Sequence, residues 1–434
     1  MKKNKNSGLL YRGFKAYIRF IHETLLIRRR YTIGLDHLPK EGERYFIVCN
    51  HQNTAEDPFN ILFSLPMHYR VCAMARANVF FVHPLITRFL HWIGLVPAFR
   101  FGWEGGEGLE QNFDSFEQVA EKVNAGMPLI VFPEAGHTQG HYLDRFTTGS
   151  VRMAFHAAKF NNWKEDIKIV PSAHHYSDYF DVQTEFLWMV SEPISLKPYY
   201  GRFQEHPNSV MREITRELHG RIRSMMLDEG IENYEQKDYL RCSALNPASL
   251  EKLPLPEHLE ADKQFVKKLL ENPDYQEIIG LTEELRKQEK ALGVSDLTIS
   301  EKPGWIQTVC RILLLVVLLP LWLVSLWPHA ICYVFPPKLI KSDRMFVNSY
   351  RYVVSALVIY PLSALLTVLV MGLGWGLWWQ ALVWVLVWVL LGRFCWWYYQ
   401  QLRKCVQAVC YLCSPKKVRE IEHVRANIRE KLKV

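Results

Sequence analysis

The sequence predicts an α/β domain followed by an α-helical membrane domain. At 434 residues the chain is too long for one ordinary domain. Up to about residue 305 its composition is close to that of a globular protein, and short apolar runs alternate with helical stretches. After that point the hydrophobic runs are far denser than a soluble core requires. We therefore expect the soluble domain to precede the membrane domain.

Both ends of the chain are basic. The net charge is +8, and residues 1–30 hold nine Lys or Arg against one acid, while residues 415–434 hold seven against three. Cations clustered beside apolar helices favour anionic lipid headgroups. The sequence contains no recognised nucleic-acid reading module, so these charges favour a membrane surface and no nucleic acid as partner.

Residues 1–34 predict a basic amphipathic helix. Arg12, Lys15 and Arg19 interrupt its apolar run, which argues against a signal peptide and would let them line the flanks of the helix. Such a helix is suited to the headgroup layer of a membrane, or its apolar face packs on the following domain, and both alternatives stay open. The apolar residues that share one helical face are Leu10, Phe14, Tyr17, Ile18, Ile21 and Leu25.

Residues 35–245 have the texture of an α/β domain. Short apolar runs at residues 45–49, 128–132 and 167–171 predict buried strands, and residues 57–65 predict a helix.

Residues 246–305 are rich in Glu and Lys with few turn signals. This pattern predicts solvated helices that link the α/β domain to the membrane part.

Residues 306–400 predict a transmembrane domain with two or three hydrophobic segments. Ile312–Phe335 and Tyr352–Leu373 are each long enough to cross a bilayer, and Gly376–Phe394 is near the lower limit. The glycines between the last two segments indicate a membrane hairpin, flanked by Trp and Tyr residues typical of membrane interfaces. Residues 401–434 form a basic C-terminal tail.

The positive-inside rule places the basic loop at residues 338–351 and the C-terminus on the cytoplasmic side. Three full crossings would then put the N-terminal domain outside. A bend at Pro320 would instead make the first segment re-entrant, with both of its ends on the same side. We therefore expect a cytoplasm-facing membrane protein whose N-terminal domain is cytoplasmic.

The nine cysteines do not resemble a secreted disulfide scaffold, and they favour a reducing compartment. Cys410 and Cys413 form a C-x-x-C with Cys405 nearby, but no second pair accompanies them. His174 and His175 also lack a further ligand at a convincing spacing, so we interpret them as structural. The sequence predicts no metal site.

A histidine follows the first predicted strand. His51 lies in a polar loop, and Glu56 and Asp57 come one helical turn or so later. A carboxylate there can accept the proton of one imidazole nitrogen, which leaves the other nitrogen able to take a proton from a substrate hydroxyl. This pattern predicts general-base catalysis with the substrate as nucleophile.

Three further blocks follow in order. They are Gly94 to Arg100, Val131 to His137 with the run Phe-Pro-Glu-Ala-Gly-His, and Ile169 to Ser172 with an apolar Val-Pro. With the His51 block, this series resembles the glycerolphosphate and 1-acylglycerolphosphate acyltransferase family over roughly residues 35–200. The resemblance implies a mixed sheet flanked by helices, and a transfer of a fatty acyl group from acyl-CoA or acyl carrier protein to a hydroxyl, with no cofactor.

The resemblance implies that His51 is the catalytic base and that an acid after it is the orienting group. The common family spacing selects Glu56, whereas the branch with a His-x5-Asp-Pro motif selects Asp57, which precedes Pro58. We prefer Asp57 and keep Glu56 as the alternative.

The resemblance also implies an acceptor site. Arg100 would bind the acceptor's phosphate, and Glu134 would position the acceptor through its hydroxyls, beside Gly136. The third block has His137 where the family has a second arginine. His137, Arg145 or Arg152 would have to replace it, and the sequence does not rank them.

The implied function is membrane-bound acylation of glycerol-3-phosphate or 1-acylglycerol-3-phosphate in phospholipid biosynthesis. The altered third block keeps open a different lyso-lipid headgroup, such as an amino-acid lipid. A non-catalytic lipid-binding membrane scaffold is the alternative from another class, and the intact His51 with a neighbouring acid argues against it.

Overall fold

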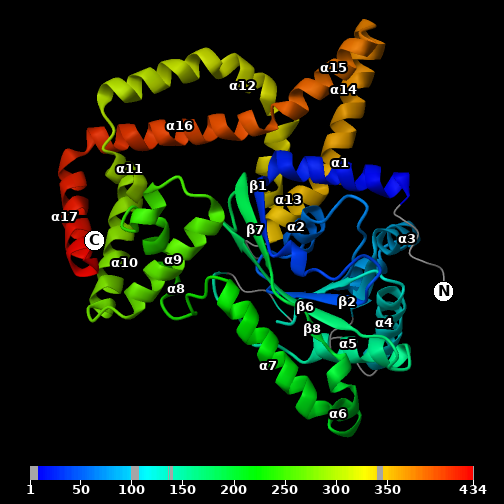
Figure 1. Ribbon diagram of the computed structural model, residues 1–434. Helices are drawn as coiled ribbons and strands as arrows, with labels where there is room; N and C mark the ends of the chain where they lie inside the picture. Colours follow the sequence, from blue (N-terminus) through cyan, green and yellow to red (C-terminus); the bar gives the residue numbers. More distant parts are fainter. Residues whose placement is uncertain (1–7, 99–106, 135, 137–139, 340–345, 434) are drawn as a thin grey trace.

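The computed structural model describes residues 8–98, 107–134, 136, 140–339 and 346–433. The chain forms a mixed α/β domain, drawn from blue to green in Figure 1, followed by a helical region. The predicted fold class is therefore confirmed.

Within these residues, eight strands form one sheet in the order β1-β7-β6-β2-β5-β3-β4, with β8 beside β6. Strand β6 is antiparallel to both β7 and β8, whereas β2 is parallel to its neighbours β5 and β6. The strands are β1 (Ile27–Ile33), β2 (Tyr45–Cys49), β3 (Cys72–Arg76), β4 (Leu95–Ala98), β5 (Leu129–Val131), β6 (Lys168–Tyr176), β7 (Thr184–Val190) and β8 (Ile194–Ser195).

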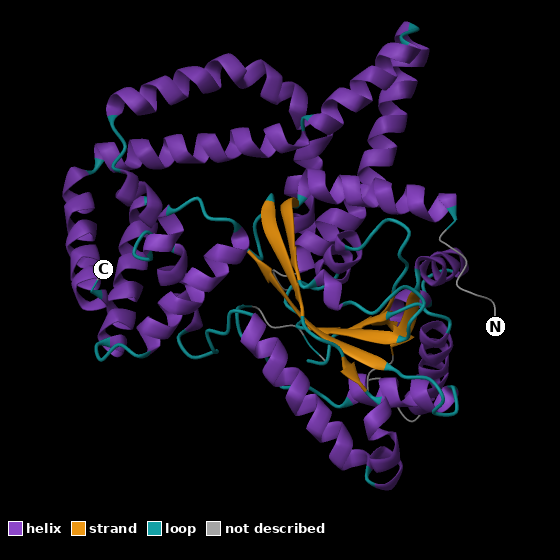
Figure 2. Cartoon of the chain, viewed as in Figure 1, coloured by secondary structure: helices purple, strands orange, loops and turns teal. Residues whose placement is uncertain are grey.

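Both faces of the sheet are buried under helices, which Figure 2 shows in purple around the orange strands. Successive side chains of a strand point to opposite faces. Accordingly, Phe46 and Val48 of β2 belong to one hydrophobic cluster, while Tyr45 and Ile47 belong to the other. The first cluster includes helices α4 (Glu107–Asn124), α5 (Gly149–Phe160) and α7 (Pro207–Met225), and the second includes α1 (Leu9–Leu25) and α2 (Glu56–Ser64).

The strands and the helix expected from the sequence are present at the expected places, within a few residues. One boundary differs. The predicted N-terminal helical region extends to residue 34, but α1 ends at Leu25, and Ile27–Ile33 is a strand that pairs with β7. The short elements of this half are α3 (Pro84–Ile93), α6 (Tyr200–Glu205), α8 (Tyr234–Cys242), and 3-10 turns at Leu35–His37, Ala77–Phe80, Lys197–Tyr199 and Pro247–Leu250.

Helix α1 packs on the domain through a buried face that includes Ile18, Ile21 and Leu25. Other apolar side chains of this helix are exposed: Leu9 and Leu10 at its N-terminal end, and Phe20. Lys15 was expected on a flank of this helix, and that expectation is wrong, because its side chain is fully buried.

The region expected to be a solvated linker is a packed helical unit. Helices α9 (Leu255–Leu270), α10 (Tyr275–Leu292) and α11 (Asp296–Glu301) bury apolar side chains that join the core cluster of the sheet. The basic C-terminal segment is also helical rather than a loose tail. Helix α17 (Pro415–Leu432) packs against α10, and Arg425 forms a buried ion pair with Asp296.

The C-terminal region carries long apolar helices. Within the described residues, Trp305–Val334 and Phe346–Trp375 are long and apolar enough to cross a membrane, and the bent pair Trp378–Leu390 and Gly392–Cys413 would make a third if it is one span. The helices concerned are α12 (Trp305–Leu339), α13 (Phe346–Val354), a π-helical turn at Ser355–Ile359, α14 (Tyr360–Trp375), α15 (Trp378–Leu390) and α16 (Gly392–Cys413).

Helix α12 continues through Pro320, where the sequence predicted a bend. Its non-helical residue is instead Trp327, so the kink lies further along the segment than expected. Helices α14 and α15 form the expected hairpin, which projects away from the sheet in Figure 1. Helix α16 runs beside α12, and the pair reaches from α1 to α11.

Candidate active site

The site is built on the loop of residues 50–57, which we call the catalytic loop. It begins where the buried strand β2 ends at Cys49, and it leads into α2 at Glu56. Asn50 ties the loop to the neighbouring strand, because its side chain accepts a hydrogen bond from the His174 amide at 2.9 Å and donates one to the His174 carbonyl at 3.2 Å. The loop is thus held at the carboxyl end of β2.

The geometry shows which of the two candidate acids, Asp57 or Glu56, contacts His51. His51 Nδ1 lies 2.8 Å from Asp57 Oδ2. The same carboxylate oxygen accepts the backbone amides of Gln52 and Asn53, each at 2.9 Å. These amides fix the carboxylate, so that it selects the imidazole tautomer with its proton on Nδ1 and the basic lone pair on Nε2.

Glu56 points elsewhere. Its Oε2 lies 2.5 Å from Nε2 of His22 on helix α1, and the other ring nitrogen of His22 lies 2.6 Å from a guanidinium nitrogen of Arg30. Glu56 therefore joins the N-terminal helix to α2 and does not contact His51 through any hydrogen bond among the described residues.

Asp57 is fully buried, and its second oxygen is also occupied. Oδ1 accepts the hydroxyl of Tyr176 at 2.8 Å and lies 3.0 Å from His174 Nε2. Burial alone would raise the pKa of Asp57, but the two histidines, His174 first and then His51, hold that pKa well below its usual range. The carboxylate is therefore ionised at every physiological pH.

His174 was interpreted from the sequence as structural, and the structure places it against Asp57. Burial would lower its pKa, but the Asp57 carboxylate and then Cys49 raise it above the ordinary value. A charged imidazolium fits the contacts, because its second nitrogen lies 3.1 Å from Cys49 Sγ while the thiol donates to Asn50. Only the strand register, which pairs Cys49 with Ser172, could have indicated that position 174 lies beside the loop.

Glu134 contacts the catalytic loop from the third block. Its Oε1 accepts the backbone amide of His51 at 2.7 Å, and its Oε2 accepts the amide of Asp144 at 3.3 Å. Burial raises the pKa of Glu134 to about 7, against the lowering effect of these two amides. The side chain is thus a buried carboxyl that can change its protonation state near neutral pH.

Phe132 packs against His51. Its ring stacks on the His51 imidazole with centroids 4.1 Å apart and planes 12° apart, and the His51 side chain keeps 15% of its surface exposed. The stacked ring and the Asp57 contact fix the imidazole plane while one part of it reaches solvent.

The structure describes only some of the predicted acceptor residues. Arg100 and His137 lie outside the described residues. Gly136 is half-buried, and a Cβ there would meet no described atom within 4 Å. The remaining arginine candidates, Arg145 and Arg152, are both exposed, with Arg145 next to the residue whose amide binds Glu134.

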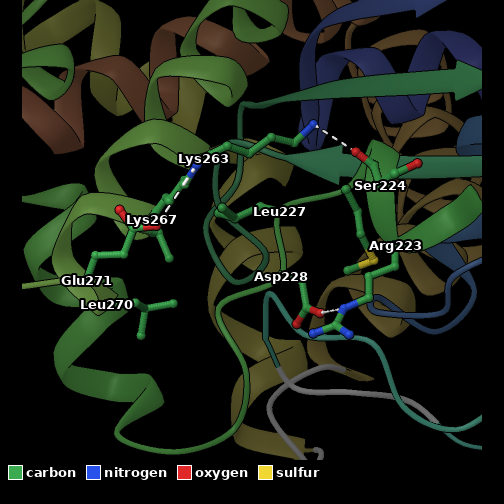
Figure 3. A pocket seen from close by; sticks show the side chains of 10 residues that line it. Arg223, Ser224, Leu227, Asp228, Lys263, Lys267, Leu270 and Glu271 are labelled. Atoms are coloured by element: carbon green, nitrogen blue, oxygen red, sulfur yellow. Dashed lines mark hydrogen bonds and ion pairs between the residues drawn. The ribbon is translucent and has the colours of Figure 1, made fainter. Parts of the chain in front are cut away.

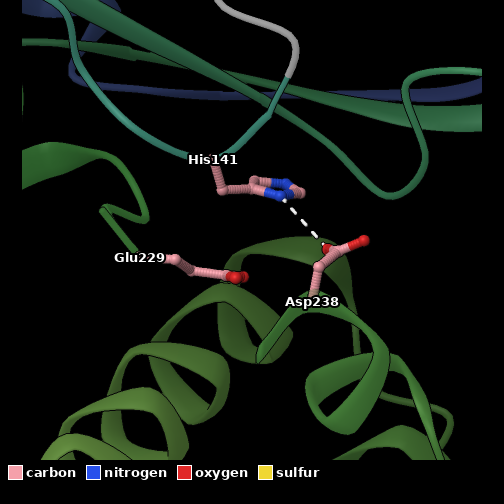
Figure 4. A group of neighbouring side chains, drawn as sticks. All are labelled: His141, Glu229 and Asp238. Atoms are coloured by element: carbon pink, nitrogen blue, oxygen red, sulfur yellow. Dashed lines mark ion pairs between the residues drawn. The ribbon is translucent and has the colours of Figure 1, made fainter. Parts of the chain in front are cut away.

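Among the described residues, one group of side chains has metal-ligand character. His141, Glu229 and Asp238 offer atoms that lie within 4.8 Å of one another, and Figure 4 shows them converging. The guanidinium of Arg241 already binds both carboxylates, through Nε to Glu229 at 2.8 Å and through Nη2 to Asp238 at 2.5 Å. We interpret the group as a buried ion network that anchors the segment after the third block, at His141, to Glu229 and to Asp238 of α8. Cys405, Cys410 and Cys413 are free thiols.

A surface pocket lies between the end of α7 and α9 (Figure 3). Its cations are paired locally: Arg223 with Asp228, and Lys267 with Glu271. The pocket shares no lining residue with the His51 site.

Comparison with known proteins finds similarity for the part of the chain that contains His51. Residues 29–175 match the family model described as Acyltransferase. A solved structure similar to part of the chain is PlsC, the 1-acyl-sn-glycerophosphate (LPA) acyltransferase from Thermotoga maritima, with 15% identity, a TM-score of 0.34, and coverage of 48% of this chain and 77% of that one. No curated protein matches the chain.

Proposed function

We propose that the protein is a membrane-bound O-acyltransferase, because residues 29–175 match the Acyltransferase family model. It transfers a fatty acyl group from acyl-CoA or acyl carrier protein to glycerol-3-phosphate or 1-acylglycerol-3-phosphate. The observation that carries the proposal is the 2.8 Å contact between His51 Nδ1 and the buried, ionised Asp57. No cofactor is needed for this chemistry.

The proposed reaction is direct transfer without an acyl-enzyme. His51 Nε2 takes the proton of the acceptor hydroxyl as its oxygen attacks the thioester carbonyl. The tetrahedral intermediate then expels the thiolate, which receives the proton from His51. Asp57 stabilises the imidazolium between the two steps, and general-base catalysis of this type contributes about 10² to 10⁴-fold.

The apolar helices support a membrane location for this reaction. In the part of the chain that the structure describes, two helices are long and apolar enough to cross a bilayer, and the product of the proposed reaction is a lipid. We propose that the catalytic domain faces the cytoplasm and that the basic residues near both ends contact anionic headgroups. The lipid product then need not cross water.

The direct test is acyl transfer by the purified full-length protein in lipid nanodiscs. Glycerol-3-phosphate and lysophosphatidate are offered as acceptors, with acyl-CoA or acyl carrier protein as donor. We expect transfer to one of the phosphate acceptors, and a loss of about 10² to 10⁴-fold in kcat for a folded His51→Ala variant. Activity that persists without His51 would contradict the mechanism.

The neighbouring acids Asp57 and Glu56 allow two matched variants to be compared in the same assay. Asp57→Asn should lower kcat by about 10² to 10⁴-fold, because an amide no longer stabilises the imidazolium or fixes its tautomer. Glu56→Gln should keep kcat within about threefold of wild type, because Glu56 contacts His22 and not His51. The opposite ranking would assign the orienting role to Glu56.

A second class of acceptor is also a candidate substrate, because the third block reads Phe-Pro-Glu-Ala-Gly-His and lacks the family's second arginine. An acyltransferase for another lyso-lipid headgroup, such as an amino-acid lipid, fits this departure. Competition between that lyso-lipid and lysophosphatidate distinguishes the two. If neither acceptor is acylated and lipid is still bound, the chain is a lipid-binding scaffold.

A further inference from the structure

The catalytic loop touches a helix almost three hundred residues away. Ser349 lies on α13, at the start of the second candidate membrane span. Its hydroxyl accepts the backbone amide of Ala55 at 3.0 Å and forms a hydrogen bond with the hydroxyl of Thr54. Both Ser349 and Thr54 are buried, so water does not replace these contacts.

Thr54 needs such a contact. Its φ is +46°, in the left-handed region that β-branched residues rarely adopt. A backbone conformation of this kind is unfavourable and persists only where surrounding groups hold it. Ser349 binds the side chain of this residue and the amide of the next one, so it restrains the strained part of the loop.

The neighbouring residue Asn348 fixes the same helix to a third segment. Its side-chain amide donates to the carbonyls of Tyr179 at 3.3 Å and Asp181 at 3.2 Å. Asn53 of the catalytic loop donates to the same Tyr179 carbonyl at 3.3 Å. Helix α13 and the catalytic loop are thus bound to the same acceptor, the Tyr179 carbonyl between β6 and β7.

We propose that α13 is a positioning element of the active site, in which Ser349 holds the catalytic loop so that His51 and Asp57 meet. The inference rests on the proposed function and extends it to the membrane half of the chain. Thr54 and Ala55 lie between the base and its acid in the sequence, so a shift of the loop at these residues changes the geometry of the pair. The second span therefore acts in catalysis in addition to anchoring the protein.

The first arm of the test does not depend on activity. Backbone hydrogen exchange of the catalytic loop is measured by mass spectrometry in nanodiscs, for wild type and for Ser349→Ala. We expect faster exchange in the peptide that contains Ala55, because its amide loses its acceptor. The control is Ser363→Ala, the same change in the same span, roughly 20 Å further along the helix. Its exchange in the loop should match wild type.

The second arm measures acyl transfer. Ser349→Ala should lower kcat by about 10- to 100-fold with acceptor KM within about threefold, because misplacement of reacting groups acts mainly on turnover. Thr54→Ala probes the same contact from the loop side without changing the membrane helix. In that background Ser349→Ala should cost less than in wild type, since the two residues share one interaction.

The outcomes are distinguishable. Wild type that transfers no acyl group would contradict the proposed function, while the exchange arm would still decide whether Ser349 restrains the loop. Unchanged loop exchange in Ser349→Ala overturns the inference. So does faster exchange with wild-type kcat, because the restraint would then not position the catalytic pair.

Discussion

Asp57 lies between two histidines with different tasks. His51 keeps part of its surface in solvent, whereas His174 is completely buried on the other carboxylate oxygen. Ion pairing in a buried site stabilises the charged form of both partners. His174 therefore supplies a positive charge near neutral pH that keeps Asp57 ionised and oriented, while the partly exposed His51 is the base of the proposed mechanism.

Replacing His174 should reveal this charge through the pH dependence of stability. Its raised folded pKa means that the stabilisation is complete below the unfolded value of about 6.5 and is lost as pH rises through the folded pKa. His174→Gln should thus lower the free energy of unfolding by about 3 kcal/mol near pH 7, and the deficit should shrink toward about pH 10. Thermal denaturation in one detergent at several pH values measures it.

The adjacent histidine provides the control. His175 is also buried, but burial, followed by His141, lowers its pKa well below the ordinary value, so it is neutral in the folded state. His175→Gln should show a deficit that stays constant from about pH 7 to pH 10, because neither state titrates at this position there. A constant deficit for His174→Gln would mean that its imidazole is neutral in the folded protein.

At the residue scale the sequence predicted what lies close in the chain. His51, its two candidate acids and Glu134 could be identified because their blocks carry local patterns. Their partners could not, because His174 comes from another strand and Ser349 from a distant helix. No local signal distinguishes a serine that binds the catalytic loop from other serines in apolar helices.

Among the helices and strands, too, the sequence predicted some and missed others. Strands β2, β5 and β6 were predicted because they are short apolar runs buried on both faces. Strand β1 was not, because it is an edge strand with three consecutive arginines and a largely exposed pattern. Helices α9 to α11 were expected to be solvated from their charge, but regularly spaced leucines on one face bury against the sheet domain.

Helix α1 holds the clearest example of tertiary structure overriding a pattern. Lys15 has the position of a flanking cation, yet its ammonium donates to the carbonyls of Pro66 at 2.9 Å, Tyr69 at 3.3 Å and Leu65 at 3.4 Å. Burial, followed by repulsion from Arg19, lowers its pKa to about 8. The lysine therefore closes the end of α2, and it attaches α1 to the helix that carries Asp57.

Lys15→Met should destabilise the protein by about 2–3 kcal/mol, because the three carbonyls lose a charged donor in a buried place. Arg19→Met removes the same charge from the same helix, but its ion pair with Glu23 is partly exposed, so its loss should cost at most about 1 kcal/mol. Thermal unfolding of the two variants compares them directly. Equal shifts would mean that Lys15 contributes no more than a surface charge.

At the scale of the whole molecule, both ends of α12 are attached to one folded body. Near its first end, Gln407 of the adjacent α16 binds Ser295 at 3.0 Å and Thr298 at 2.7 Å, beside α11. Near its other end, the Tyr333 carbonyl accepts Arg351 of α13 at 3.3 Å. Ile299 of α11 belongs to one core cluster of the sheet domain, and Ile18 of α1 belongs to the other. If α12 crossed the bilayer, its two ends would lie on opposite sides of the membrane. In the structure both ends are attached to the same domain.

We therefore predict that α12 begins and ends on the side of the catalytic domain. Single cysteines in a cysteine-free protein, at Lys302, at Lys338 and at Lys159 on α5, should all react with one membrane-impermeant reagent from the same side of sealed vesicles. A cysteine at Gly374, near the exposed tip of the α14–α15 hairpin where a Cβ meets open space, should not react from that side, because we expect the apolar hairpin to enter the bilayer. If the cysteines at positions 302 and 338 are labelled from opposite sides, α12 crosses the membrane. In that case the contacts of α11 with the sheet domain would have to break when the protein enters the membrane.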